Sequence, residues 1–239
     1  MTIPNINFSV RDILSRAWEL LKNNFFQLFL IWLVWLALGI PVAIVDMAMQ
    51  EMMLNDAVWF ILYIIYKVFV AIFISIPLAL GNYKILLNIV DGKEAQLATL
   101  FSQYKPSLII HTIFGYIAIT IPILIGYLFF IIPGIYLTLR LQFFHLVLIE
   151  QEKPDFSEAI KESWNRTEDH SLKLFLLGLM SFGVTLLGWL ACCIGVIPAI
   201  MVAYLMSVIA FRLLGGKGAG GANPMIDRDA TSEYSEVVQ

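Results

Sequence analysis

Charged residues and cysteine are both scarce in this chain. Charged residues make up 14% of 239 residues, and the two cysteines are the neighbours Cys192 and Cys193. Soluble domains carry about a quarter of charged residues, so this composition argues against an ordinary soluble domain. Two adjacent cysteines cannot join distant parts of a chain, so we expect no disulfide framework. We interpret them as small apolar residues at a helix end, with a soft-metal or redox site as the alternative.

The common motifs of catalysis are also missing. The polar segments contain no Ser-His-Asp order, no acid pair and no Walker pattern. Three glycines that could suggest a phosphate loop, Gly178, Gly183 and Gly188, lie instead within an apolar run. We therefore expect no enzyme, no cofactor and no nucleic-acid partner. An intramembrane enzyme that acts on lipid stays as an alternative.

Long apolar runs are what the sequence has in abundance. Hydrophobic residues make up 60% of the chain, and a helix needs about 20 apolar residues to cross a bilayer. The runs do not alternate with polar residues, which favours helices over a barrel. A tight reversal is expected at Pro133-Gly134. The six predicted spans cover residues 25–45, 57–82, 107–131, 134–150, 172–193 and 194–214.

Three amphipathic helices are predicted ahead of the three pairs of spans, at about residues 9–22, 95–105 and 155–167. Their patterns superpose when the aromatic residues of each are aligned, which indicates an internal repeat. Such helices can lie in the headgroup layer, with an aromatic side chain as the anchor. The three expected anchors are Trp18, Phe101 and Trp164.

The resulting fold class is an all-α integral membrane protein. Residues 1–214 form six transmembrane helices arranged as three hairpins, each preceded by a cytoplasmic interfacial helix. Residues 215–239 are glycine-rich and then acidic, which predicts a disordered cytoplasmic tail.

The positions of the basic residues predict the topology. Six spans place thirteen of the fifteen Lys and Arg on one side, and the loops on the other side hold none. Cytoplasmic loops carry the excess of Lys and Arg, so both termini are expected in the cytoplasm. The thirteen are Arg11, Arg16, Lys22, Lys84, Lys93, Lys105, Lys153, Lys161, Arg166, Lys173, Arg212, Lys217 and Arg228.

The other two basic residues, Lys67 and Arg140, lie inside predicted spans. A basic side chain at mid-bilayer costs a few kcal/mol, so it is a candidate functional group. Counting residues from the outer ends places both in the outer half of the bundle, where they could form a cationic pocket for a lipid headgroup or an anionic solute. The alternatives are snorkelling to headgroups, or a pair with Asp46, Asp56 or backbone carbonyls.

Three histidines are expected near the cytoplasmic ends of spans, with Glu150 at a similar depth. Histidine and carboxylate side chains at one level could bind a metal or relay protons. Their spacing lacks a ligand signature, so interfacial histidines with local hydrogen bonds are the alternative. The candidates are His111, His145, His170 and Glu150.

One segment, residues 107–177, carries a recognisable sequence pattern. The residues that carry it are Ile131–Tyr136, Arg140, Leu146–Glu150, Ala159, Ile160, Ser163 and Trp164. With this pattern the chain resembles bacterial six-helix membrane proteins of the YciC-like kind, and the membrane domain attached to some glycerophosphodiester phosphodiesterases. The phosphodiesterase activity belongs to a separate soluble domain without a counterpart here, so the resemblance implies a membrane fold and no catalysis.

Together these observations predict a non-catalytic protein of a bacterial plasma membrane. It would serve as a structural or accessory factor in envelope homeostasis, with membrane lipids as partners, and other membrane proteins or a second copy of the chain as further candidates. The alternative function is a small transporter or channel subunit for an anionic solute or lipid headgroup, with Lys67 and Arg140 lining its path.

Overall fold

The structure, a computed structural model, describes residues 9–53, 57–190 and 195–215. Within these ranges the chain is helical and contains no strand. Asp56, Cys192, Cys193 and the predicted tail from residue 216 onward lie outside the described residues. Six helical segments are long and apolar enough to cross a membrane, as expected for a multi-pass membrane protein: Phe25–Gln50, Ala57–Val90, Pro106–Phe129, Ile131–Glu150, Ser171–Leu190 and Val196–Leu213.

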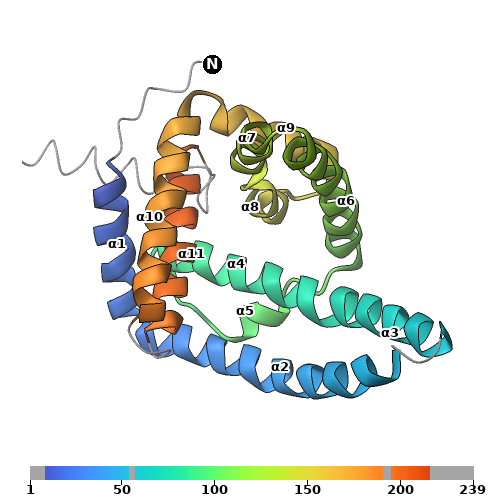
Figure 1. The fold of residues 1–239 in the computed structure, drawn as a ribbon. Helices are drawn as coiled ribbons and strands as arrows, with labels where there is room; N and C mark the ends of the chain where they lie inside the picture. Colours follow the sequence, from blue (N-terminus) through green and yellow to red (C-terminus); the bar gives the residue numbers. More distant parts are fainter. Residues whose placement is uncertain (1–8, 54–56, 191–194, 216–239) are drawn as a thin grey trace, which may run out of the picture.

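Consecutive spans pack against each other: α2 with α3, α6 with α7, and α10 with α11 (Figure 1). The π-helical turn η1 continues α3 into α4, and the short 3-10 turn η2 leads from α9 into α10. The helices are α1 Val10–Asn23, α2 Phe25–Met53, α3 Ala57–Val70, η1 Ala71–Ser75, α4 Ile76–Val90, α5 Ala98–Phe101, α6 Pro106–Phe129, α7 Ile131–Leu141, α8 Phe144–Glu150, α9 Phe156–Thr167, η2 Glu168–His170, α10 Ser171–Leu190 and α11 Val196–Leu213.

The first two spans are longer than predicted. The segment α3–η1–α4 runs for 34 residues from Ala57 to Val90, which is about 51 Å of helix. The hydrocarbon core of a bilayer is about 30 Å thick. The helix thus continues beyond the predicted span end at residue 82, and Leu86, Leu87 and Ile89 of this continuation are buried by protein contacts.

The reversal between α6 and α7 lies at Phe130 and not at Pro133-Gly134. Phe130 has extended backbone angles, φ −155° and ψ 136°, while Pro133 is tolerated in the first turn of α7, where an amide donor is not needed. Gly134 has a different role, because a Cβ there would lie 2.5 Å from the ring of Tyr127. The glycine therefore permits close packing of α6 on α7.

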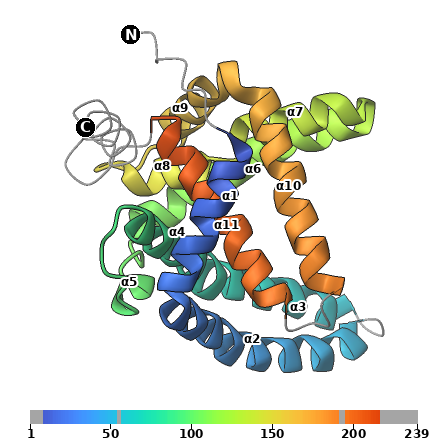
Figure 2. The same ribbon diagram turned by 90° about the vertical axis from the view of Figure 1, so that its left-hand side faces the viewer.

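The three predicted interfacial helices differ in outcome. The helix α9 matches its predicted range, and the Asp155 carboxylate caps it by accepting bonds from the amides of Ser157 and Glu158. The second is only the four-residue helix α5 between turns. The first, α1, packs on α11 and α10 and buries Ile13 and Ala17 there (Figure 2). Protein therefore covers the apolar face of α1 that was expected to meet lipid.

The buried core is concentrated in part of the bundle. It comprises most of α4 and α11, the α8 segment and the inward faces of α1 and α10. In α3, by contrast, Val70 alone is buried among the described residues. The helices α2 and α3 thus extend from the core with most of their apolar side chains exposed.

Candidate functional site

Lys67 lies on α3 and pairs with an acidic residue of α2. Its Nζ is 3.1 Å from the carboxylate of Asp46, and the two side chains are 46% and 28% exposed. The neighbouring Tyr66 hydroxyl donates to the backbone carbonyl of Val42 at 3.2 Å. These two bonds hold α3 against α2. The pair of Lys67 with Asp46 was one of the alternatives to a cationic pocket.

Arg140 is buried near the end of α7, with 2% of its surface exposed. Its guanidinium lies 4.3 Å from the ring centroid of Trp164 and 5.4 Å from that of Tyr136, distances at which a cation is attracted to an aromatic face. One terminal nitrogen is 3.6 Å from the carboxylate of Glu168. The Nε and Nη1 atoms have no hydrogen-bond partner among the described residues.

The backbone of Arg140 also holds α9 in place. Its carbonyl accepts hydrogen bonds from the Ser163 hydroxyl at 3.0 Å and the Thr167 hydroxyl at 3.2 Å. The residues Arg140, Ser163 and Trp164, which carried the family resemblance, are therefore in mutual contact at one junction of α7 with α9. This contact gives the sequence pattern a structural role.

The structure does not bring Lys67 and Arg140 to one place. Their helices, α3 and α7, lie far apart in both views (Figures 1 and 2). Lys67 contacts α2, and Arg140 contacts α9. The count of residues from span ends gave similar depths, but depth says nothing about the position of a helix in the membrane plane.

The three histidines are also separate. His145 Nε2 lies 2.6 Å from the Tyr116 hydroxyl, while the His111 Nδ1 accepts from the amide of Phe156 at 3.4 Å. His170 is buried beyond α9. Within the described residues, no three His, Cys, Asp or Glu side chains come together to hold a metal.

The expected anchors have different environments. Trp18 and Phe101 are 47% and 52% exposed, and Trp18 lies 5.6 Å from the Nζ of Lys22. Trp164 is half-buried and covers Arg140 instead. The side chains of Trp18 and Phe101 can therefore contact lipid headgroups or water, whereas Trp164 packs inside the protein.

A group of buried charges joins the ends of four helices. The Arg212 guanidinium of α11 makes two bonds of 2.8 Å to the carboxylate of Asp91, which follows α4. Arg212 also pairs with Glu150 at the end of α8, and Glu150 lies 3.9 Å from Arg166 of α9. We call Asp91, Glu150, Arg166 and Arg212 the charge cluster.

The charge cluster is well shielded and internally paired. The exposed fractions of the side chains are 3% for Arg212, 5% for Asp91, 11% for Glu150 and 8% for Arg166. Arg166 also pairs with Glu162, and its guanidinium lies 4.8 Å from the ring of Phe211. Sequence reasoning missed this cluster, although one signal was available: Asp91, Glu150 and Arg212 each stand at the end of the second helix of a predicted hairpin.

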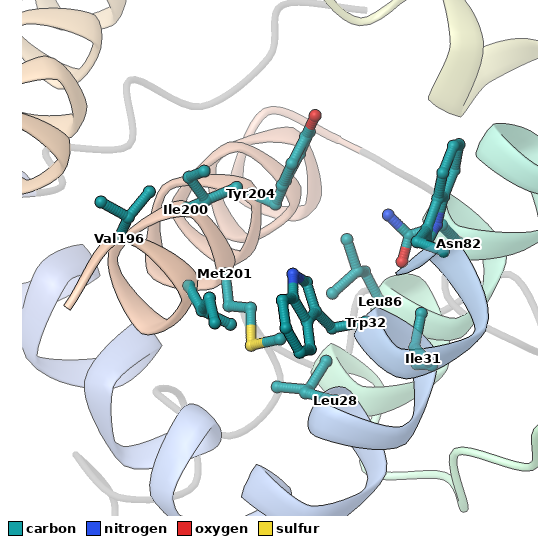
Figure 3. Close-up of a pocket in the computed structure, with 11 residues that line it drawn as sticks. Leu28, Ile31, Trp32, Asn82, Leu86, Val196, Ile200, Met201 and Tyr204 are labelled. Atoms are coloured by element: carbon teal, nitrogen blue, oxygen red, sulfur yellow. The ribbon is translucent and has the colours of Figure 1, made fainter. Parts of the chain in front are cut away.

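An apolar pocket of about 300 Å³ lies between α2, α4 and α11. In Figure 3 the indole of Trp32 projects from α2 between residues of α11 and α4. Only Asn82 and Tyr204 among the lining residues offer an amide or hydroxyl. The other lining residues are apolar: Leu28, Ile31, Trp32, Trp35, Leu86, Val196, Ile197, Ile200 and Met201.

The chain matches no protein-family model, no curated protein and no solved structure. The resemblance to the YciC-like family therefore stays a prediction.

Proposed function

We propose that this chain is a non-catalytic protein of a bacterial plasma membrane, with both termini in the cytoplasm. It binds lipid as an accessory or structural factor of the envelope, with its α2–α4–α11 pocket holding part of an acyl chain. Other membrane proteins, or a second copy of the chain, are further candidate partners. The predicted three-hairpin arrangement with interfacial helices belongs to this proposal.

The observation that carries the proposal is the apolar pocket. Its volume of about 300 Å³ falls at the lower end of the range for small-molecule sites. The flanking residues Leu33 and Leu36 of α2 are 39% and 40% exposed, so the pocket borders a surface that meets hydrocarbon in a membrane. Acyl chains are the apolar molecules available at that surface, and burial there stabilises each methylene in van der Waals contact.

The transport alternative loses its main support. It required Lys67 and Arg140 to line one path, and each instead has its own partners in a separate part of the molecule. Neither residue lines the apolar pocket between α2, α4 and α11. An anion path through the bundle would need other groups.

A filling substitution tests acyl-chain binding. Met201 lines the pocket, and Met201→Trp would fill part of it. Losing about ten heavy-atom contacts, at about 0.1–0.2 kcal/mol each, should weaken lipid retention about tenfold. Native mass spectrometry in mild detergent, with lipid identification, measures the retained phospholipid per protein.

Leu36→Trp is the matched control, because Leu36 lies on the exposed surface of α2 and outside the pocket lining. It should retain as much lipid as the unchanged chain. Thermal unfolding of both variants checks that they fold. Equal lipid retention by the two folded variants would refute the proposed pocket.

A further inference from the structure

A second cavity, of about 500 Å³, lies next to the apolar pocket along α11. Ile200 and Tyr204 line both this cavity and the apolar pocket. The second cavity is bounded by α4, by the break between α7 and α8, and by α10 and α11. Hydroxyl or amide groups come from six of its lining residues: Tyr83, Gln142, Ser181, Thr185, Tyr204 and Ser207.

Two hydrogen-bond donors of this cavity lack a good acceptor. The Gln142 side-chain nitrogen is buried and has no hydrogen-bond partner among the described residues. The Ser181 hydroxyl reaches only the thioether sulfur of Met206, at 3.8 Å, and a thioether is a weak acceptor. A buried donor without a partner costs free energy comparable to a lost hydrogen bond. The cavity is therefore suited to a ligand that presents oxygen acceptors.

The cavity also carries no charge. No Asp, Glu, Lys or Arg is among its described lining residues. Ser207 lies six residues before the end of α11 at Leu213, and Thr185 lies fourteen residues after the start of α10 at Ser171. The lining residues therefore lie about 9 to 21 Å from these two helix ends. A charged headgroup would be costly at that depth, whereas an uncharged one would not.

We propose that this cavity binds the uncharged head of a neutral glycerolipid, with its ester carbonyls and free hydroxyl, as in diacylglycerol. The carbonyl oxygens accept from Gln142 and Ser181, and the lipid hydroxyl meets the hydroxyls of Tyr204 and Ser207. Gly178 and Ala203 leave room for the glycerol backbone. The inference rests on the proposed function in requiring a lipid-binding chain in a bilayer, but it uses a separate cavity.

Two glycines of α10 provide a matched test. A Cβ at either Gly178 or Gly183 meets nothing within 4 Å, but Gly178 alone of the two lines the cavity. Gly178→Leu therefore extends a side chain toward the cavity from an unobstructed Cβ, and Gly183→Leu adds the same side chain to the same helix elsewhere. Both variants should fold, which thermal unfolding checks.

The probe is a photoreactive diacylglycerol in phosphatidylcholine vesicles that contain the purified full chain. We expect labelled peptides from α10 and α11, at least fivefold less labelling in Gly178→Leu, and unchanged labelling in Gly183→Leu. Gln142→Leu removes one donor and should weaken labelling about threefold, the average effect of one hydrogen bond in a membrane. Equal labelling of the two glycine variants would overturn the assignment.

A photoreactive phosphatidic acid distinguishes an uncharged head from an anionic one. It should label the cavity peptides weakly, and labelling as strong as that by diacylglycerol would overturn the assignment. Met201→Trp separates this inference from the acyl-chain pocket. If Met201→Trp leaves phospholipid retention unchanged while Gly178→Leu loses diacylglycerol labelling, the acyl-chain pocket fails and the neutral-lipid cavity stands. The reverse pattern overturns the cavity alone.

Discussion

Two regions of this molecule handle charge in opposite ways. The charge cluster buries Asp91, Glu150, Arg166 and Arg212 between four helices. At the α2–α3 pair, Lys67 and Asp46 form one ion pair with both side chains partly exposed. The apolar side chains around them differ in burial as well. Those of α4 and α11 are largely buried near the charge cluster, while those of α2 and α3 are largely exposed.

Buried charges should matter more for the stability of the fold than exposed ones. Removing one partner of a buried pair leaves an uncompensated charge in a low-dielectric site, which costs far more than the loss of an exposed pair. The charge cluster also joins the ends of α4, α8 and α11, which are distant in sequence. We therefore expect the charge cluster to hold α4, α8 and α11 together, and the Lys67–Asp46 pair to hold only α2 to α3.

The largest effect is expected from Arg212→Met. This change removes two bonds of 2.8 Å to Asp91 and the pair with Glu150, and it leaves two carboxylates buried. The free energy of unfolding should fall by about 3–5 kcal/mol, measured by denaturant titration in mild detergent micelles. Adding Asp91→Asn should recover part of the loss, because it neutralises one of the two carboxylates.

Arg11→Met is the control for that change, because Arg11 lies on the exposed face of α1. It should alter the free energy of unfolding by less than about 0.5 kcal/mol. A loss for Arg212→Met as small as that for Arg11→Met would mean that the charge cluster does not hold the helices together.

The sequence predicted the helices of the fold better than their contacts. Asp155 and Pro106 predicted the starts of α9 and α6, and the long apolar runs predicted the six spans, because capping and hydropathy are local properties. The bond between Arg212 and Asp91 joins residues 121 positions apart. Nothing in a single sequence pairs two such residues, although both mark a helix end.

The candidate sites were predicted less well, for a related reason. Lys67 and Arg140 were recognised as unusual because a basic residue in an apolar run is visible in the sequence. Their partners Asp46 and Trp164 depend on how helices are arranged around one another. The two cavities are likewise formed by residues of several helices, so hydropathy alone could not reveal them.

Glycine substitutions extend the comparison from charge to packing, with one glycine in the buried helix α4 and one in the exposed helix α2. A Cβ at Gly81 of α4 would lie 1.9 Å from the backbone oxygen of Leu100 in α5, whereas a Cβ at Gly39 of α2 meets nothing within 4 Å. Gly81→Ala should therefore lower the free energy of unfolding by about 1–3 kcal/mol. Gly39→Ala should raise it by up to about 1 kcal/mol, because alanine favours a helix.

The same detergent unfolding assay checks the glycine pair, and circular dichroism confirms that both variants stay helical. Equal effects of the two changes would contradict the close approach of α4 to α5. A loss at Gly39 alone would indicate that another molecule covers α2.

The smallest effect is expected from Lys67→Met, which removes the exposed pair with Asp46 at 3.1 Å. A polar contact between transmembrane helices contributes about 0.6 kcal/mol on average, so the free energy of unfolding should fall by about that amount. Asp46→Asn should behave in the same way, and the double variant should be no less stable than either single one. A loss above about 2 kcal/mol would instead place this pair in a dry contact with a partner, because burial makes a broken pair costly.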